Sequence, residues 1–210
     1  MTDSRLVAVL ARSRRLGLLG SAAVDVQVAH AEGFAASIEG PPERFLDLGS
    51  GGGVPGLVLA VRWPESEAVL LDGRERRCAF LREAVRELGL GPRVSVVCAR
   101  AEEAARREDL RGRLDVVVAR GFGPPPVTAE CGAGFLRVGG RLVVSEPPGG
   151  VDEDQTDAGV RWDPSGLAML GLAKGPLRGE RFHYRLLEQV EPCPQRFPRR
   201  TGVPAKRPLF

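Results

Sequence analysis

The residues best suited to chemistry lie in the segment FLDLGSGGGVPG, at positions 45–56. An acid, Asp47, stands near its start. Three glycines follow at intervals of two: Gly49, Gly51 and Gly53. A second acid, Asp72, comes about 20 residues after the glycines, a spacing typical of loops that bind nucleotide cofactors. The segment therefore predicts a cofactor site.

The charge of Asp47 separates two classes of cofactor. Residues 51–56 also fit the G-x-G-x-x-G pattern of dinucleotide loops, whose backbone N–H groups bind a pyrophosphate. An anionic side chain at the start of the loop works against that ligand, but it suits S-adenosylmethionine, which is cationic and has no phosphate. A turn without a ligand is disfavoured, because so many glycines cost conformational entropy. The pattern D-x-G-x-G-x-G followed by Asp72 resembles the Rossmann-like methyltransferases that use S-adenosylmethionine.

Alternating strands and helices must position this loop. Five strands are expected from the mostly apolar runs at 44–49, 67–72, 93–99, 114–119 and 140–146. Apolar residues at helical spacing predict crossover helices at 54–62 and 76–91. Such alternation predicts an α/β fold with a doubly wound, mostly parallel sheet covered on both faces. Ligands of these sheets bind beyond the carboxyl ends of the strands.

The two ends of the chain depart from this alternation. Residues 1–40 are expected to form a helical N-terminal extension, and residues 41–195 the cofactor-binding domain. Within that domain, residues 166–173 and 181–190 predict an antiparallel pair at the sheet edge, and residues 147–159 an acidic loop. Residues 196–210 hold five Lys or Arg and no acid, which predicts a basic C-terminal tail.

Composition excludes several classes of protein. With 210 residues, 43% of them apolar, the chain can bury a core, and a net charge of +3 demands no polyanionic partner. Four cysteines without a C-x-x-C pair and two histidines predict neither a zinc site nor a disulfide framework. No apolar run approaches the roughly 18 residues of a membrane span. We expect a soluble, cytoplasmic protein with no metal and no membrane partner.

Further motifs narrow the family. The segments RFLDLGSGGGVPGLVLA, LLDGRERRCAFLREAVRELGL, CARAEE, LDVVVARGF and PRRTGVPAKRPL together resemble the glucose-inhibited division protein B family. Its members are small-subunit ribosomal RNA methyltransferases that methylate a guanine of 16S rRNA at N7. The resemblance implies a class I methyltransferase fold, S-adenosylmethionine as the cofactor, and 16S rRNA or the small ribosomal subunit as the partner.

The resemblance also implies roles for individual residues. Gly49 and Val54 would line the cofactor, Ala101 and Glu102 would flank its adenine, and Asp72 would take its ribose hydroxyls. Arg120 would lie at the junction of cofactor and substrate and act as the catalytic residue. The expected cofactor site is Asp47, Gly49, Gly51, Gly53, Val54, Asp72, Ala101, Glu102 and Arg120.

Some of these roles can be weighed from the residues alone. Arg120 directly follows a buried strand, where ligands of parallel sheets bind, so a functional role is favoured over a solvated one. Glu102 is equally an acid in the favoured first turn of a helix. Phe122 either stacks on the target base or anchors its loop.

The expected chemistry needs little from the protein. Guanine N7 carries an in-plane lone pair and loses no proton, so alignment matters more than a general base. Cations of the tail would neutralise RNA phosphates, although a solvated tail is the simpler interpretation. The expected substrate-binding residues are Phe122, Arg199, Arg200, Lys206 and Arg207.

Two departures from the family lie on the expected substrate side. Gly33 and Phe34 replace an aspartate and a serine, and Ser145 and Glu146 replace a lysine-glycine step, which would put an anion beside RNA phosphate. Two alternatives therefore stay open. One is a diverged methyltransferase acting on another RNA or a small molecule. The other is a non-catalytic protein that senses S-adenosylmethionine and binds RNA or the ribosome.

Overall fold

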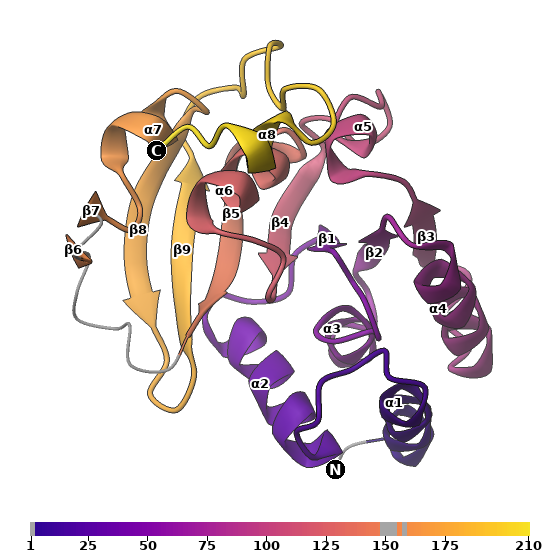
Figure 1. Ribbon diagram of the computed structural model, residues 1–210. Helices are drawn as coiled ribbons and strands as arrows, with labels where there is room; N and C mark the ends of the chain where they lie inside the picture. The colour runs from indigo at the N-terminus through magenta and orange to yellow at the C-terminus, as the bar shows by residue number, and fades with distance from the viewer. Residues whose placement is uncertain (1–2, 148–154, 157–158) are drawn as a thin grey trace.

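A mixed seven-stranded sheet forms the centre of the protein (Figure 1). The computed structural model describes residues 3–147, 155–156 and 159–210. The strand order is β3-β2-β1-β4-β5-β9-β8. The strands are β1 (Arg44–Leu48), β2 (Glu67–Asp72), β3 (Val94–Cys98), β4 (Leu114–Ala119), β5 (Leu136–Glu146), β8 (Leu172–Arg178) and β9 (His183–Gln189).

The directions of the strands confirm the expected fold class. Strands β1 to β5 pair in parallel, whereas β9 pairs antiparallel with both β5 and β8. The sheet is thus mostly parallel with an antiparallel pair at one edge. A separate short hairpin joins β6 (Gln155–Thr156) and β7 (Gly159–Val160). The acidic loop expected at 147–159 otherwise falls almost entirely outside the described residues.

The first strand of the edge pair was misplaced by the sequence analysis. Residues 166–173 were expected to be a strand, but helix α7 (Pro164–Ala168) occupies the start of that range and β8 begins at Leu172. The helix begins after Asp163, whose side chain accepts a hydrogen bond from Gly166 N at 2.7 Å. An N-cap aspartate followed by proline at the first helical position is a regular helix start, which the apolar alternation had concealed.

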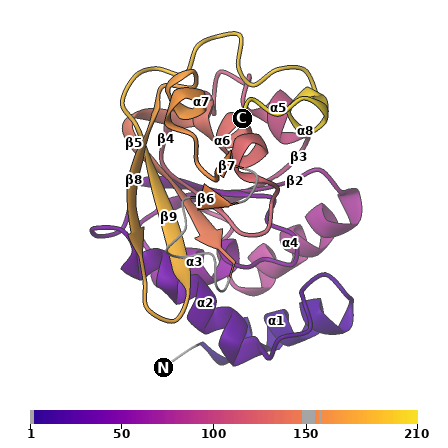
Figure 2. The same ribbon diagram turned by 60° about the vertical axis from the view of Figure 1, so that its left-hand side comes forward.

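Helices cover both faces of the sheet (Figures 1 and 2). One face carries α1 (Ser4–Arg15), α2 (Val24–Ala36), α3 (Gly56–Arg62) and α4 (Glu75–Glu87). The other carries α5 (Ala101–Ala104), α6 (Pro125–Ala133), α7 and α8 (Val203–Lys206). Successive residues of β1 serve opposite faces: Phe45 packs in the core beneath α1 to α4, and Leu46 in the core beneath α5 to α7. No helix within the described residues is both long and apolar enough to cross a membrane.

Both ends of the chain pack against the sheet domain. The hydroxyl of Ser13, in α1, donates to Gly52 O at 2.9 Å, which ties the N-terminal extension to the glycine segment. At the other end, Arg199 forms an ion pair with the buried carboxylate of Glu130 in α6. The segments expected to be an extension and a tail therefore both lie next to the predicted site.

Candidate active site

The glycine loop follows β1 and turns directly into α3. Gly49, Gly51 and Gly53 have φ angles of 77°, 54° and 98°, which only glycine adopts readily. Gly49 N and Ser50 N both donate to Leu71 O, at 2.9 and 2.8 Å, and this fastens the loop to the end of β2. The predicted glycines thus shape a turn at the carboxyl ends of two parallel strands.

The N–H groups of this loop are already engaged within the protein. Gly51 N donates to Asp72 Oδ2 at 2.9 Å, Gly53 N to Ser50 O at 2.7 Å, and Gly56 N to Asp47 Oδ2 at 2.8 Å. Together with the two bonds to Leu71 O, five N–H groups of the loop and of the start of α3 have internal acceptors. A pyrophosphate would need such groups free.

The carboxylate of Asp72 ends β2 and is 4% exposed. Its Oδ1 accepts from Arg74 N at 2.9 Å, and its Oδ2 accepts from Gly51 N and lies 3.4 Å from Arg77 Nη1. These donors fix the carboxylate in position beside the glycine loop. Each carboxylate oxygen offers about two acceptor sites, so Asp72 can accept further hydrogen bonds from a ligand.

A cavity of about 290 Å³ opens beyond the carboxyl ends of β1 to β4. Five of the residues predicted from the sequence line it: Gly49, Asp72, Ala101, Glu102 and Phe122. The sequence analysis did not predict the rest of its wall: Leu71, Gly73, Ala99, Arg100, Gly123, Pro124, Val127, Cys131 and Ala205. Most of these residues follow directly after a strand, so the strand-end rule could have found them. Cys131 and Ala205 come from α6 and α8, and their positions carry no such signal.

The C-terminal segment closes one side of this cavity. Gly202 N donates to Glu102 Oε1 at 2.8 Å, and Arg100 Nε lies 3.7 Å from Glu102 Oε2. Glu102 is 4% exposed, so it is not the solvated acid of an ordinary helix start. It holds α8 in place, and this brings Ala205 into the cavity wall.

Phe122 lies against the glycine loop. A Cβ atom on Gly49 would come within 2.8 Å of the Phe122 ring, so glycine at this position allows the ring to approach. The ring is half-buried and packs against the core beneath α5 to α7. This placement agrees with Phe122 as a wall of the cavity.

Asp47 and Arg120 lie together at the ends of β1 and β4. Burial raises the pKa of Asp47 to about 7, and the charge of Arg120 opposes that rise. Asp47 Oδ1 is buried and has no hydrogen-bond partner in the described part of the protein. Burial lowers the pKa of the half-buried Arg120, and the charge of Asp47 opposes that change. Asp47 is therefore a buried support of the loop with one free oxygen, rather than a fully charged group at its surface.

The remaining predicted residues lie outside the cavity. Gly51, Gly53 and Val54 belong to the loop behind it, and Val54 is buried in the core beneath α1 to α4. Arg199 is engaged with Glu130 at 2.6 Å and so is not presented to solvent as a phosphate ligand would be. Three other cations of the tail are exposed: Arg200, Lys206 and Arg207. No cluster of three or more metal-binding side chains occurs in residues 3–147, 155–156 and 159–210.

Glu146 does not have the role that its charge suggested. Its side chain is 2% exposed and accepts from Arg161 Nε at 2.7 Å and from the indole N–H of Trp162. The carboxylate is thus neutralised and buried at the end of β5. The expected repulsion of RNA phosphate by Glu146 is not supported by this placement.

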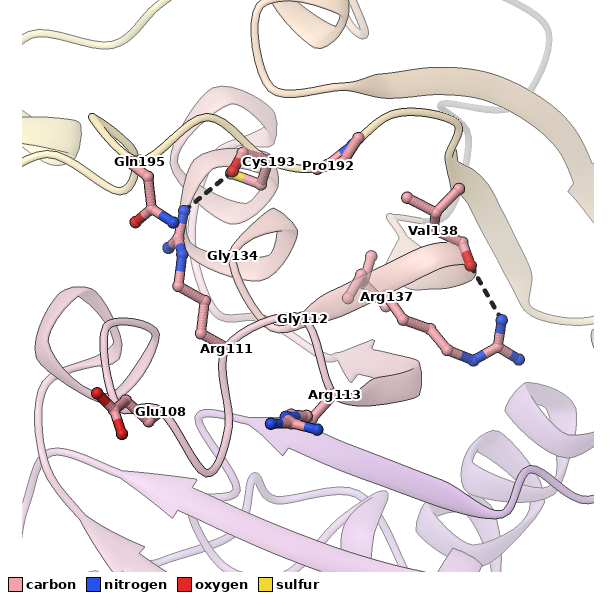
Figure 3. A pocket seen from close by; sticks show the side chains of 11 residues that line it. Glu108, Arg111, Gly112, Arg113, Gly134, Arg137, Val138, Pro192, Cys193 and Gln195 are labelled. Atoms are coloured by element: carbon pink, nitrogen blue, oxygen red, sulfur yellow. Dashed lines mark hydrogen bonds between the residues drawn. The ribbon is translucent and has the colours of Figure 1, made fainter.

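A second cavity, of about 540 Å³, lies at the opposite ends of the strands (Figure 3). It is lined by residues at the amino ends of β4 and β5 and by the chain after β9. Arg111 donates to Cys193 O at 3.0 Å and to Pro194 O at 3.1 Å, and Arg137 donates to Val138 O at 3.0 Å (Figure 3). These arginines anchor the chain leading to the tail. The smaller cavity is the candidate site, because ligands of parallel sheets bind at the carboxyl ends.

Solved structures with the same arrangement define the class of fold. An O-methyltransferase from Bacillus cereus in complex with SAH aligns with a TM-score of 0.63 at 15% identity, covering 90% of this chain and 92% of that chain. The O-methyltransferase TomG from Streptomyces achromogenes, in complex with SAM, aligns with a TM-score of 0.60 at 20% identity, covering 90% of both chains. The chain therefore has the class I methyltransferase fold predicted from its sequence.

Sequence relatives define the family. The profile of the family described as rRNA small subunit methyltransferase G matches residues 31–153. A protein of that name from Rubrobacter xylanophilus is 40% identical over 176 residues, which cover 79% of this chain and 65% of the relative. Its counterpart from Moorella thermoacetica is 35% identical, covering 80% of this chain and 70% of the relative. The chain belongs to the rRNA small subunit methyltransferase G family, as the sequence resemblance indicated, and spans about two thirds of the length of these relatives.

Proposed function

We propose that this protein transfers the methyl group of S-adenosylmethionine to N7 of a guanine in 16S rRNA. One observation carries the choice of cofactor: the N–H groups of the glycine loop are used internally, at Asp47, Asp72, Leu71 and Ser50. This loop can approach a ligand closely, but it has few donors for a pyrophosphate. Family membership supports ribosomal RNA as the substrate.

The residues around the cavity fit S-adenosylmethionine. Asp72 can accept hydrogen bonds from ribose hydroxyls, and Ala101 and Val127 offer apolar surface to an adenine ring. Asp47 Oδ1, buried and without a partner, suits a donor or a positive charge. Every group that would contact the cofactor thus has chemistry that matches part of it.

The acceptor chemistry asks for positioning. When bound, S-adenosylmethionine supplies an electrophilic methyl group, which guanine N7 accepts with its lone pair and without loss of a proton. The protein has to align the base and exclude water. Cys131 lines the cavity, but burial raises the pKa of its thiol, so it stays protonated and is no nucleophile. Arg120, at the end of β4, is placed to hold the base.

Exposed cations next to the cavity support an RNA substrate. Arg200, Lys206 and Arg207 flank α8, which contributes to the cavity wall. Phosphates bound there would place the RNA beside the methyl donor. Because bacterial ribosomal RNA is made and assembled in the cytoplasm, we propose a cytoplasmic location, with the small ribosomal subunit or its RNA as the partner.

Binding and transfer can be measured separately. Calorimetry should detect S-adenosylmethionine at micromolar concentration and no binding of NAD at the same concentration. The purified protein should then add one methyl group per small subunit isolated from cells that lack the modification, as scored by nucleoside mass spectrometry. Binding of NAD in place of S-adenosylmethionine would overturn the cofactor assignment. Cofactor binding without methyl transfer would favour a sensing role.

A further inference from the structure

His30, in α2, lies in an aromatic cluster beside β9. Its ring centroid is 4.7 Å from that of Phe182, 5.6 Å from that of Tyr184 and 5.7 Å from that of Phe34. The hydroxyl of Tyr184 donates to His30 O at 2.6 Å. The imidazole is therefore held in a fixed orientation by neighbours on two elements.

Gly33 makes this arrangement possible. A Cβ atom at position 33 would lie 2.1 Å from the Tyr184 hydroxyl, so any other residue would displace Tyr184 from α2. Phe34 is fully buried and packs edge-on against Tyr184 at 4.7 Å. Gly33 and Phe34, which depart from the family pattern, thus form a matched set with the aromatic residues of β9.

The imidazole of His30 nevertheless has no polar partner. Its Nδ1 is buried, and no hydrogen bond to either ring nitrogen occurs among the described residues. Buried polar atoms in proteins are nearly always hydrogen-bonded, and exceptions call for an explanation. Burial and the charge of Arg120 lower the pKa of His30 to about 4, so the ring is neutral near pH 7 and has one donor and one acceptor nitrogen.

Arg120 brings a second unfilled group to the same place. It stands at the carboxyl end of β4, and its charge lowers the pKa of His30, Asp47 and Tyr184. Its half-buried guanidinium makes no hydrogen bond or ion pair with the described part of the chain. His30 Nδ1, Asp47 Oδ1 and Arg120 therefore form a group of unpartnered polar atoms.

The position of this group relates it to the cofactor cavity. Phe34 and Tyr184 belong to the core beneath α1 to α4, whereas Phe122 in the cavity wall packs against the opposite core. Arg120 is two residues from Phe122 in the same strand-end loop. The His30 cluster and the cavity thus lie on the two sides of the ends of β1 and β4, as a methyl acceptor and a methyl donor must.

We propose that the imidazole of His30 and the guanidinium of Arg120 form the subsite that recognises the acceptor guanine; this inference rests on the proposed function. Guanine carries two acceptors, O6 and N7, on one edge and two donors, N1–H and N2–H₂, on another. Arg120 donates to O6 beside the reacting N7, and the acceptor nitrogen of His30 takes a donor of the base. Adenine presents an amino donor in place of O6, so it opposes the donors of Arg120. The pair therefore selects guanine.

The test replaces His30 while keeping its packing. His30→Phe retains an aromatic ring among Phe34, Phe182 and Tyr184 but removes both nitrogens, and His30→Gln retains one donor and one acceptor. His183→Phe, at the other histidine of the chain, is the matched control. Initial rates of methyl transfer to unmodified small subunits and calorimetric affinity for S-adenosylmethionine are measured for each variant, with circular dichroism to verify folding.

The expected results separate recognition from folding and from cofactor binding. We expect His30→Phe to bind S-adenosylmethionine within about twofold of the wild type but to lose on the order of 10-fold or more in kcat/KM, since a buried donor or acceptor is left unpaired. His30→Gln should recover part of that loss, and His183→Phe none of it should show. Wild-type kcat/KM in both His30 variants would overturn the inference alone. Absence of methyl transfer by the wild type would refute the proposed function, and the inference with it.

Discussion

Replacing Arg199 by alanine should destabilise the protein, because Arg199 holds a carboxylate that has no exposed surface. The side chain of Glu130 is 0% exposed, and Arg199 donates to its two oxygens from Nε at 2.9 and 3.1 Å and from Nη2 at 2.6 Å. The backbone N of Arg199 adds a bond to Glu130 Oε1 at 2.7 Å. The guanidinium also donates to Arg207 O at 2.7 Å, so it braces the tail from within.

The size of the effect follows from the burial of the two partners. Removing one partner of a buried ion pair costs about 3–5 kcal/mol, because the other charge is left without compensation. The side chain of Arg199 is 26% exposed, so water can enter the space that alanine leaves, and the backbone bond to Glu130 remains. The lower end of the range, about 3 kcal/mol, is therefore the expected loss in free energy of unfolding.

Urea unfolding of Arg199→Ala, followed by circular dichroism, measures this loss. The neighbouring Arg200→Ala is the control, because Arg200 is exposed and should alter stability by no more than about 0.5 kcal/mol. The double replacement Glu130→Gln with Arg199→Met should be less destabilising than Arg199→Ala, since it leaves no buried charge. Equal stability of Arg199→Ala and Arg200→Ala would refute the role given to the ion pair.

Three further predictions concern the cofactor and RNA. Asp72→Ala should weaken S-adenosylmethionine binding by about 1–3 kcal/mol in calorimetry, because ribose hydroxyls lose their acceptor; unchanged affinity would disprove that role. Burial raises the pKa of Asp47 from 3.8 to about 7, so its protonation supports the fold below about pH 4 and this support is lost as the pH rises through 7. Asp47→Asn should therefore gain stability over the wild type between pH 4 and 7, by up to about 4 kcal/mol, in urea unfolding at each pH; a difference that does not change with pH would contradict this. Replacing Arg200, Lys206 or Arg207 by alanine should each lower the salt slope of RNA binding by about one unit and leave S-adenosylmethionine affinity unchanged, as measured by fluorescence anisotropy and calorimetry; an unaltered slope would remove them from the RNA interface.

Much of the fold could be predicted because its signals are local. Buried parallel strands are apolar runs, and a glycine loop with acids at fixed spacing lies where such strands end. Gly49, Asp72 and Phe122 follow strands directly, and all three line the cavity. The edge strand at 172–178 was misplaced because alternating apolar residues mark a strand and a short buried helix equally well.

Contacts between distant parts of the chain could not be predicted in this way. Arg199 and Glu130 are 69 residues apart, and Gly202 and Glu102 are 100 apart. Charge alone suggested that Arg199 binds phosphate, whereas a buried acid elsewhere decides its role. The meaning of Gly33 likewise depends on Tyr184 in β9, which is adjacent only after folding.

The central claim is tested most directly by the 16S rRNA of cells whose gene for this protein has been deleted. Nucleoside mass spectrometry should show one fewer 7-methylguanosine per 16S rRNA than in the parent strain, and the wild-type gene should restore it while a gene encoding Arg120→Ala should not. An unchanged 7-methylguanosine content in the deletion strain would contradict the account.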